Sequence, residues 1–366
     1  MSAAGAPPLV LSVFSTFAIG GPQVRFATLA NRLGPAFRHA IVAMDGDLGC
    51  AERLAPGLDI AWPEVAIRKG DTFGNAWRFR RALRRIRPDV LVTYNWGTIE
   101  WALANAWPLA RHVHVEDGFG PEEQSAQLPR RVLMRRAFLR RRTVVVPSRT
   151  LWRIATEVWR LPEARLRYIP NGIDLARFAP AAERAAGQPV TIGTVAALRS
   201  EKNLARLLRA FRLLPEEGGA RLVIAGEGPE RASLEALAVA LGLGGRVRFT
   251  GHVGDPAPLY RTFDLFALSS DTEQMPLSVL EAMAAGLPVV ATDVGDVRAM
   301  LAAENAPFVT TRDEAGLAEG LRRLAEDAPL RARIGAANRA RAEREYDERA
   351  MVGAYAALFA ESEQAG

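Results

Sequence analysis

The sequence predicts an α/β protein built from two doubly wound parallel-sheet domains. Short apolar segments typical of buried strands alternate with helix-like segments along nearly the whole chain. The length of 366 residues exceeds the size at which a single hydrophobic core keeps growing, so two domains are expected. Residues 172 to 189, a stretch rich in Ala, Pro and Gly, interrupt this alternation and mark the boundary between two series.

The first series occupies residues 1 to 170. The apolar segments that we expect to form one parallel sheet are "PLVLSVFS", "HAIVAM", "PDVLVTY", "RHVHVE", "RTVVVPS" and "LRYIPNG". Segments between them, such as "AWRFRRALRRI", have helical periodicity. We interpret "PPLVLSVFSTFAIGG" near the start as a strand and a loop, because no basic residue precedes it and glycines follow it.

The second series occupies residues 171 to 345. Its expected strands are "VTIGTVAAL", "ARLVIAGEGP", "RVRFTG", "DLFALSS" and "LPVVATD". A last helical pattern in residues 347 to 366 is expected to pack back on the first domain. We expect the two Rossmann-like domains to face a central cleft, because open α/β sheets bind ligands at the carboxyl ends of their strands.

Composition restricts the classes of protein that the chain can represent. The net charge of +6 and the isoelectric point near 10.0 admit nucleic acid, an anionic membrane or acidic substrates as partners. The single cysteine, Cys50, excludes an internal disulfide framework, and we expect a cytoplasmic location. Because no uninterrupted run of about 18 apolar residues occurs, we expect a soluble or peripheral protein without a membrane-spanning helix.

Two glutamates, Glu273 and Glu281, lie on either side of an expected helix start. "DLFALSS" ends a strand and "DTEQM" is a loop. Pro276 suits the first turn of the following helix, and Gly286 is a natural stop. Because side chains tilt toward the N-terminus of their helix, Glu281 would lean back toward the loop that carries Glu273.

The start of this helix is an expected anion site. The amides of Leu277, Ser278 and Val279 have no partner within the helix and would point toward a ligand. Carboxylates accept hydrogen bonds from hydroxyl groups. Two carboxylates beside a phosphate-binding helix end therefore suit a ligand with hydroxyls next to phosphates, such as a sugar nucleotide.

A basic group strengthens this interpretation. "ALRSEKN", at the end of the first strand of the second series, places Arg199 and Lys202 just before a helix. Both could neutralise a diphosphate and stabilise it as a leaving group. Only two of the 47 basic residues are lysines, Lys69 and Lys202, and a site that needs a compact ammonium tolerates arginine poorly.

Taken together, these motifs resemble a known enzyme family. The pattern of Glu273 and Glu281 with "EAMAAGLPVVAT", together with "RSEKN", "YIPNGIDLARF" and "IGGPQ", is similar to family 4 of the retaining glycosyltransferases, which have the GT-B fold. The resemblance spans roughly residues 9 to 345. It implies transfer of a sugar from a nucleotide diphosphate donor, a UDP- or GDP-sugar, with retention at the anomeric carbon and without a bound metal or other cofactor.

The same resemblance implies roles for individual residues. Glu273 would contact the donor sugar, and Glu281 the ribose hydroxyls. Arg199 and Lys202 would bind the diphosphate, with the amides of Leu277 and Ser278 at the helix start. The loop formed by Gly20 and Gly21 would close on the phosphates, and Val253 in "TGHV" falls where the family holds the base.

One segment departs from the family pattern. Many members carry a histidine immediately before a glycine after the fourth strand of the first domain, whereas this sequence reads "HVHVEDGFG". Asp117 stands before Gly118 and would replace that histidine, while His114 lies on the strand. Either residue could touch the donor sugar or the acceptor hydroxyl, so both are catalytic candidates, with Asp117 preferred.

Other motifs favour plainer interpretations. Asp45 and Asp47 form an Asp-x-Asp pair of the kind that holds a metal in glycosyltransferases of another fold, but we favour a solvated turn and expect no metal site. "GEGPE" lacks the third glycine of a nicotinamide fingerprint. His39, His112 and His252 show no metal-ligand spacing.

The acceptor is expected to be a glycan or a lipid-linked molecule of cell-envelope or exopolysaccharide synthesis. Residues 130 to 142, "RRVLMRRAFLRRR", carry seven arginines and no acid, and could dock on an anionic membrane at its inner face. A packed helix with a solvated outer face is the alternative. Residues 78 to 87 form a second basic segment, and all seven tryptophans lie between Trp62 and Trp159, where core packing explains most of them.

Two other functions remain open. An enzyme of the same fold could epimerise or hydrolyse a nucleotide sugar, and would differ in its products with and without an acceptor. A non-enzymatic nucleic-acid-binding protein is suggested by the isoelectric point alone, and it leaves the paired glutamates unexplained. We therefore expect no nucleic-acid partner.

Overall fold

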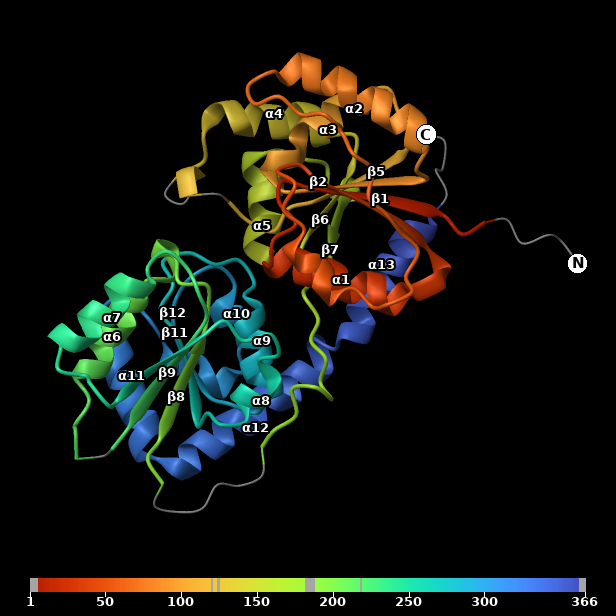
Figure 1. The fold of residues 1–366 in the computed structure, drawn as a ribbon. Helices are drawn as coiled ribbons and strands as arrows, with labels where there is room; N and C mark the ends of the chain where they lie inside the picture. Colours follow the sequence, from red (N-terminus) through yellow and green to blue (C-terminus); the bar gives the residue numbers. More distant parts are fainter. Residues whose placement is uncertain (1–5, 120, 124–125, 182–187, 218, 362–366) are drawn as a thin grey trace, which may run out of the picture. The chain divides into compact units, whose positions relative to one another are not determined.

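The computed structural model describes residues 6–119, 121–123, 126–181, 188–217 and 219–361 (Figure 1). The chain divides into two compact units. The first unit comprises residues 1–170 and 349–366, and the second comprises residues 171–348. The division between residues 170 and 171 coincides with the boundary that the sequence analysis placed between its two series. In the described part of the chain, no helix combines the length and the apolar character needed to cross a bilayer.

The first unit contains a parallel sheet of seven strands in the order β3-β2-β1-β4-β5-β6-β7. Its strands are β1 (Leu9–Phe14), β2 (Arg38–Ala43), β3 (Ile60–Ala61), β4 (Val90–Tyr94), β5 (Arg111–Val115), β6 (Thr143–Val146) and β7 (Leu166–Tyr168). The sequence analysis missed β3, because two residues are too few to show a period. The strand order reverses between β1 and β4, which is the topological switch point of a doubly wound sheet.

Helices cover both faces of this sheet, because neighbouring residues of a buried strand point in opposite directions. The helices are α1 (Gly21–Leu33), α2 (Thr72–Ile86), α3 (Ile99–Ala104), α4 (Pro129–Leu139), α5 (Arg149–Arg153) and α13 (Glu348–Ala360). Val10 and Phe14 of β1 pack with α1 and α13 on one face. Leu11 and Val13 pack with α2 and α3 on the other.

The second unit contains a parallel sheet of six strands in the order β10-β9-β8-β11-β12-β13. Its strands are β8 (Thr191–Val195), β9 (Arg221–Ala225), β10 (Val247–Gly251), β11 (Leu265–Leu268), β12 (Val289–Thr292) and β13 (Val309–Thr310). Its helices are α6 (Leu204–Arg212), α7 (Arg231–Ala240), α8 (Ala257–Tyr260), α9 (Leu277–Ala284), α10 (Val297–Met300), α11 (Glu314–Glu326) and α12 (Ala328–Glu345). Here the strand order reverses between β8 and β11.

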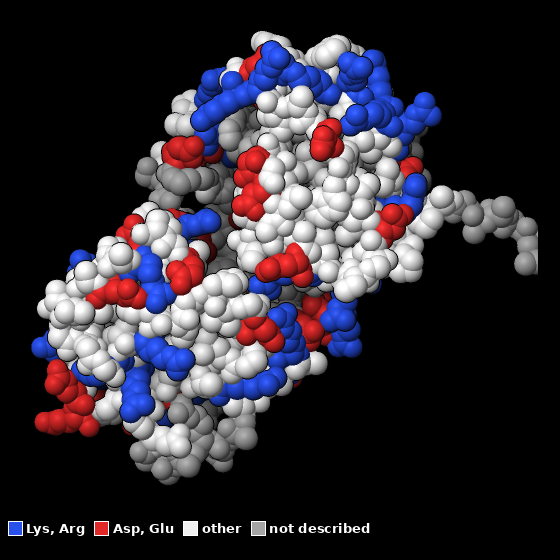
Figure 2. Space-filling view, viewed as in Figure 1, with Lys and Arg blue, Asp and Glu red and all other residues white. Residues whose placement is uncertain are grey.

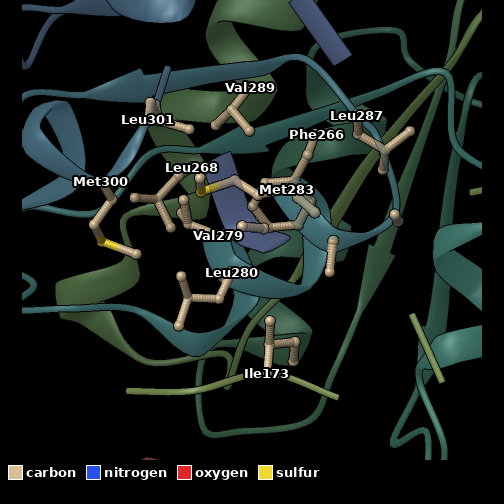
Figure 3. Close-up of a cluster of buried hydrophobic side chains, with 14 of the residues drawn as sticks. Ile173, Phe266, Leu268, Val279, Leu280, Met283, Leu287, Val289, Met300 and Leu301 are labelled. Carbon is tan, nitrogen blue, oxygen red and sulfur yellow. The ribbon is translucent and has the colours of Figure 1, made fainter. Parts of the chain in front are cut away.

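A hydrophobic cluster fixes helix α9 against the second sheet (Figure 3). Val279, Leu280 and Met283 of α9 are buried against Phe266 and Leu268 of β11. Burial of each such side chain contributes about 1.5 to 3 kcal/mol. The start of α9 is therefore held firmly at the carboxyl edge of the sheet, where the candidate site lies.

Candidate functional site

Lys202 and Glu273 meet at the switch point of the second sheet. Lys202 follows β8 and Glu273 follows β11, and these strands are neighbours. Lys202 Nζ donates a hydrogen bond to Glu273 Oε1 at 2.6 Å, and Ser270 Oγ donates to the same oxygen at 2.7 Å. The two side chains are 24% and 10% exposed, so this ion pair is partly shielded from water. The sequence analysis expected both residues at this edge but did not expect their direct contact.

The loops that carry these two residues are tied together. Asp271 donates its amide to the Glu201 carbonyl at 2.8 Å, and its carboxylate accepts from Asn203 Nδ2 at 2.9 Å. Arg206 pairs with the same carboxylate at 2.6 Å and donates to the Ser269 carbonyl at 2.8 Å. These contacts fix the distance between the loop after β8 and the loop after β11.

Gly295 supports the loop that carries Glu273, and the sequence analysis missed it. Its φ of 54° lies in the left-handed region. A Cβ at this position would stand 2.2 Å from the carbonyl oxygen of Glu273, a distance that no side chain tolerates. The amide of Asp296 donates to the Gln274 carbonyl at 2.9 Å. In the sequence, the role of Gly295 is indicated by nothing more than a glycine after β12, and a single glycine in a turn is weak evidence for such a role.

The start of α9 presents backbone amides beside Glu273. The helix begins at Leu277, so Pro276 stands at the N-cap and not in the first turn. No side chain caps this end. The amide of Val279, which was expected to point outward, donates to the Pro276 carbonyl at 3.2 Å. Leu277 and Ser278 remain the candidates for an anion-binding helix end.

Tyr260 orients Glu281, a relationship that the sequence analysis missed. The hydroxyl oxygen of Tyr260 lies 2.7 Å from Glu281 Oε2 and 3.1 Å from the Ser278 carbonyl oxygen. Burial, together with the charge of Glu281, raises the pKa of Tyr260 well above its usual value, so the phenol keeps the proton that it donates. The carboxylate of Glu281 is therefore held in one direction, one helical turn from the start of α9.

Arg199 and Val253 also lie at this carboxyl edge of the second sheet. Arg199 is exposed and caps the short helical turn Ser200–Lys202, so it belongs to the same loop as Lys202. Val253 is half-buried and follows β10, the edge strand of the sheet. The order of the strands thus places the loop of Val253 at one side of the Lys202 and Glu273 pair.

Gly20 and Gly21 lie at the switch point of the first sheet. Gly20 is the extended N-cap of α1, and Gly21 is its first residue. A Cβ on Gly20 would stand 2.7 Å from Gln23 Oε1, and Gln23 Nε2 donates to the Thr16 carbonyl at 2.9 Å. Gly20 therefore leaves room for the Gln23 side chain that ties the start of α1 to the loop after β1.

Asp117 forms a buried ion pair with Arg25 of α1. Arg25 Nη2 lies 2.8 Å from Asp117 Oδ2, and Nη1 contacts Oδ1, so both carboxylate oxygens are engaged. Arg25 is 4% exposed and the Asp117 side chain 11%. Burial lowers the pKa of Arg25, but the charge of Asp117, the hydrogen bond to it and the nearby Tyr355 and Tyr94 together hold that pKa above its ordinary value. The Asp117 amide donates to Asn95 Oδ1 at 2.7 Å.

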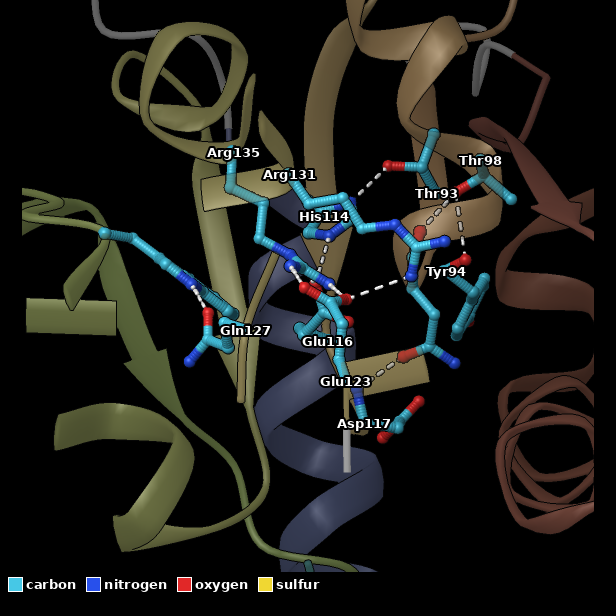
Figure 4. A network of polar contacts seen from close by, with 12 residues as sticks. Thr93, Tyr94, Thr98, His114, Glu116, Asp117, Glu123, Gln127, Arg131 and Arg135 are labelled. Atoms are coloured by element: carbon cyan, nitrogen blue, oxygen red, sulfur yellow. Dashed lines mark hydrogen bonds and ion pairs between the residues drawn. The ribbon is translucent and has the colours of Figure 1, made fainter. Parts of the chain in front are cut away.

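His114 is fully buried, which corrects the expectation that it could touch a substrate (Figure 4). Its Nδ1 lies 2.9 Å from Thr93 Oγ1, and its Nε2 lies 3.4 Å from Glu116 Oε2. Its side chain has no exposed surface, although it lies near the carboxyl end of β5. We therefore omit His114 from the catalytic residues proposed below.

Arg135 is also fully buried, which corrects the expectation that residues 130 to 142 present seven arginines to a membrane (Figure 4). Arg135 donates to Glu116 at 3.2 Å and to both oxygens of Glu123 at 3.0 and 3.1 Å. The rings of Trp96, Trp159 and Phe119 surround its guanidinium at 5.1, 5.0 and 5.3 Å. This arginine stabilises the interior of the first unit.

Asp45 and Asp47 shape their own turn. Asp45 Oδ1 accepts the amide of Asp47 at 2.9 Å, and Asp47 Oδ1 accepts the amide of Gly49 at 2.8 Å. Both hydrogen bonds are exposed, as the interpretation of a solvated turn predicts.

The fold and the sequence together define the class of protein. Residues 177–341 match the family described as Glycosyl transferases group 1, and residues 19–177 match Glycosyltransferase Family 4. The chain belongs to the group 1 glycosyltransferases, and its two parallel-sheet units have the GT-B fold.

Particular relatives come from polysaccharide synthesis. The chain is 29% identical to the lipopolysaccharide core biosynthesis glycosyltransferase LpsD of Rhizobium meliloti, over 77% of this chain and 78% of LpsD. It is 30% identical to a glycogen synthase of Mycobacterium tuberculosis, over 75% of this chain and 69% of that protein. The structure of Anabaena HepE in complex with UDP and glucose is similar in fold, with a TM-score of 0.80 at 18% identity, over 96% of this chain and 99% of HepE.

Proposed function

We propose that the chain is a retaining glycosyltransferase that moves a sugar from a nucleotide diphosphate donor to a glycan or lipid-linked acceptor. The contact between Lys202 and Glu273 is the observation that carries this proposal. It joins a cation suited to a diphosphate and a carboxylate suited to sugar hydroxyls at the ligand-binding edge of an open α/β sheet. The complex of HepE with UDP and glucose supports a nucleotide-sugar donor.

In the proposed mechanism the second unit binds the donor. Arg199, Lys202 and the amides of Leu277 and Ser278 bind the diphosphate, and their positive charge stabilises it as it leaves the anomeric carbon. Because these groups supply the positive charge that a metal ion would otherwise supply at the diphosphate, we propose that transfer needs no divalent metal. Glu281, oriented by Tyr260, accepts hydrogen bonds from the ribose, and the base lies near Val253.

Glu273 acts at the donor sugar. Its Oε1 already accepts hydrogen bonds from Lys202 and Ser270, which fix the carboxylate in place. The fixed carboxylate can accept hydrogen bonds from sugar hydroxyls and stabilise positive charge that develops on the ring. Lys202, between Glu273 and the diphosphate, links the sugar end of the donor site to its phosphate end.

The first unit binds the acceptor in this proposal. Asp117 serves to position the loop of Gly20 and Gly21 through Arg25 of α1. We assign Asp117 to positioning because both of its oxygens are held by a buried guanidinium. LpsD supports an acceptor of cell-envelope polysaccharide synthesis.

Thermal shifts against a panel of UDP-, GDP- and ADP-sugars test donor binding. One donor class should raise the melting temperature, and the Glu281→Ala variant should show a smaller rise at the same donor concentration. Analysis of the products with candidate lipid and glycan acceptors by NMR should show a new glycoside with the anomeric configuration of the donor. An inverted product would contradict retention, and a free or epimerised sugar made equally well without acceptor would favour a hydrolase or an epimerase.

A further inference from the structure

The first unit exposes three large aromatic side chains on neighbouring segments. Phe73 and Trp77 of α2 are 85% and 65% exposed, and Trp107, in the segment between α3 and β5, is 78% exposed. Their exposure shows that they do not pack in the core of the unit. Trp101 and Trp159, in contrast, are fully buried there. Single exposed apolar side chains are common, but three large aromatic residues on neighbouring segments form an exposed patch of the kind that marks an interaction site.

Helix α2 is fully packed through its other face. Phe79 is buried and stacks on Trp101 of α3 with ring centroids 4.4 Å apart. Ala82 and Leu83 belong to the same buried cluster. The outward stripe consists of Phe73, Trp77, Arg81 and Arg84, at spacings of four, four and three residues, so it runs along one helix face for about 16 Å.

The stripe carries aromatic rings at one end and positive charge at the other. Residues 68 to 87 contain eight basic side chains and one acidic one, Asp71. Asp71 caps α2 through the amide of Gly74 and pairs with Arg78 at 2.9 Å, so its charge is already compensated. The Arg81 guanidinium lies 5.9 Å from the Trp77 ring.

Arginines fix the segment of Trp107 beside α2. Arg80 of α2 donates to the carbonyls of Ala104 and Trp107, both at 2.9 Å. Arg142, just beyond α4, donates to the carbonyl of Asn105 at 2.6 Å. Figure 2 shows basic side chains gathered over α2 and α4 on this side of the unit. The Trp107 carbonyl is thus bound by Arg80 of α2, and the start of its segment is bound by Arg142.

We infer that this surface, which consists of Phe73, Trp77, Arg81, Arg84 and Trp107 and which we call the α2 surface, docks on an anionic lipid bilayer. Tryptophan and phenylalanine are favourable at the boundary between headgroups and acyl chains, and arginines bind lipid phosphates. Basic residues near an anionic bilayer each contribute to binding. On helix α4 Leu133 is 64% exposed, but Arg135 is buried inside the unit, so α4 presents fewer basic side chains than its sequence suggests.

A bilayer fits this surface better than nucleic acid does. Proteins that bind single strands interleave aromatic rings with cations along a groove, so that successive bases can stack. On α2 the two rings come first and the two arginines follow along one helix face, with Arg81 beside Trp77, so rings and arginines do not alternate. This arrangement suits a planar partner with apolar depth and a negatively charged surface. The inference extends the proposed function by placing the enzyme at the surface that holds a lipid-linked acceptor.

Vesicle cosedimentation of the full chain tests the inference. We expect binding to phosphatidylglycerol vesicles at low salt, weaker binding at high salt, and little binding to phosphatidylcholine vesicles. The double variant Phe73→Ser, Trp77→Ser should bind at least about ten-fold more weakly, because two aromatic side chains no longer insert. The affinity of the double variant Arg81→Glu, Arg84→Glu for these vesicles should also fall by at least about ten-fold.

Matched controls come from the second unit, which has exposed residues of the same kinds. Leu213→Ser with Val239→Ser removes two exposed apolar side chains, and Arg212→Glu with Arg333→Glu reverses two exposed charges. Both control pairs should bind phosphatidylglycerol vesicles like the parent protein. Tryptophan emission should be quenched by brominated phosphatidylglycerol, and the Trp77→Phe variant should reduce this quenching while preserving most of the binding.

Three results would overturn the inference. These are equal binding to anionic and neutral vesicles, no binding to either, and a larger effect of Arg130→Glu with Arg140→Glu on α4 than of the α2 variants. Salt-sensitive binding to RNA without vesicle binding would assign the surface to nucleic acid instead. Thermal shifts with the donor, measured on the same variants, are a separate readout. If no donor sugar nucleotide raised the melting temperature of the parent protein, the proposed donor site would be refuted, but the membrane surface would not.

Discussion

Lys202 Nζ lies 2.6 Å from Glu273 Oε1, although the two residues are 71 positions apart in the sequence. Each follows a strand that borders the switch point of the second sheet. The contact places an ammonium and a carboxylate where a donor's diphosphate and sugar would meet. Mutations in this pair should therefore separate binding of the nucleotide from reaction of the sugar.

Glu273→Gln should abolish transfer while nucleotide binding persists. The amide keeps the shape of the side chain but loses the charge that stabilises the reacting sugar, so kcat should fall by roughly 100-fold or more. Initial rates with saturating donor and calorimetric binding of the nucleoside diphosphate measure the two effects. Ser270→Ala, which removes only one neutral hydrogen bond to Glu273, is the control and should have the smaller effect. Near-normal turnover of Glu273→Gln would show that the role assigned to it is wrong.

Glu281→Ala should weaken donor binding by about 1 to 3 kcal/mol, because hydroxyls of the ribose would lose their acceptor. Tyr260→Phe keeps the packing of the ring but frees the carboxylate, and should weaken binding by about 0.5 to 1.5 kcal/mol. Dissociation constants from calorimetry measure both. If Tyr260→Phe weakened donor binding more than Glu281→Ala, Tyr260 could not act only by orienting Glu281, and the proposal would be contradicted.

Transfer should survive exhaustive treatment with EDTA. In the proposed mechanism Arg199, Lys202 and the start of α9 supply the positive charge at the leaving diphosphate. Rates are measured before and after chelation, and again after addition of manganese or magnesium. Complete loss of activity that either metal restores would revive a metal site, for which Asp45 and Asp47 would be the first residues to mutate.

Asp117→Asn should destabilise the first unit by roughly 3 to 5 kcal/mol, because it leaves the buried charge of Arg25 without its partner. The double variant Arg25→Met, Asp117→Leu should recover most of this loss, because it buries no charge. Urea unfolding measures the stability of each variant. If Asp117 only positions α1, the double variant should also retain measurable transfer. A stable double variant that transfers no sugar would show that the Arg25 and Asp117 pair is needed for activity beyond its contribution to stability.

His39 should make stability depend on pH in the acidic range. Both ring nitrogens are buried without a hydrogen bond in the described structure, and burial lowers the pKa of His39 to about 4 from its ordinary value of 6.5. The unfolded chain therefore binds the proton more readily, and stability is lost as pH falls from about 6.5 to about 4. The loss from this residue amounts to roughly 3 kcal/mol.

Urea unfolding between pH 7 and pH 4 should show a smaller loss for His39→Leu than for the parent protein. Some loss should remain in His39→Leu, because burial also lowers the pKa of His112 well below its ordinary value. Identical pH profiles for the parent and His39→Leu would refute the prediction.

Local patterns in the sequence were sufficient to predict the two parallel-sheet units and the edge at which the candidate site lies. The period of a strand or helix depends on neighbours within a few residues, so the ends of β8 and β11 and the start of α9 can be read without a structure. A parallel sheet then brings the carboxyl ends of its strands to one edge, which places Lys202 and Glu273 near each other.

Contacts between distant segments were decided only by the tertiary structure. The run of arginines in residues 130 to 142 indicates a solvated face, yet Arg135 is buried because Glu116, Glu123 and three aromatic rings from other segments surround it. Tyr260 and Gly295 have no distinctive local pattern, and their roles depend on contacts to Glu281 and to the loop of Glu273. Periodicity tells which residues share a face, but the burial of a charge depends on which partners the fold brings to it.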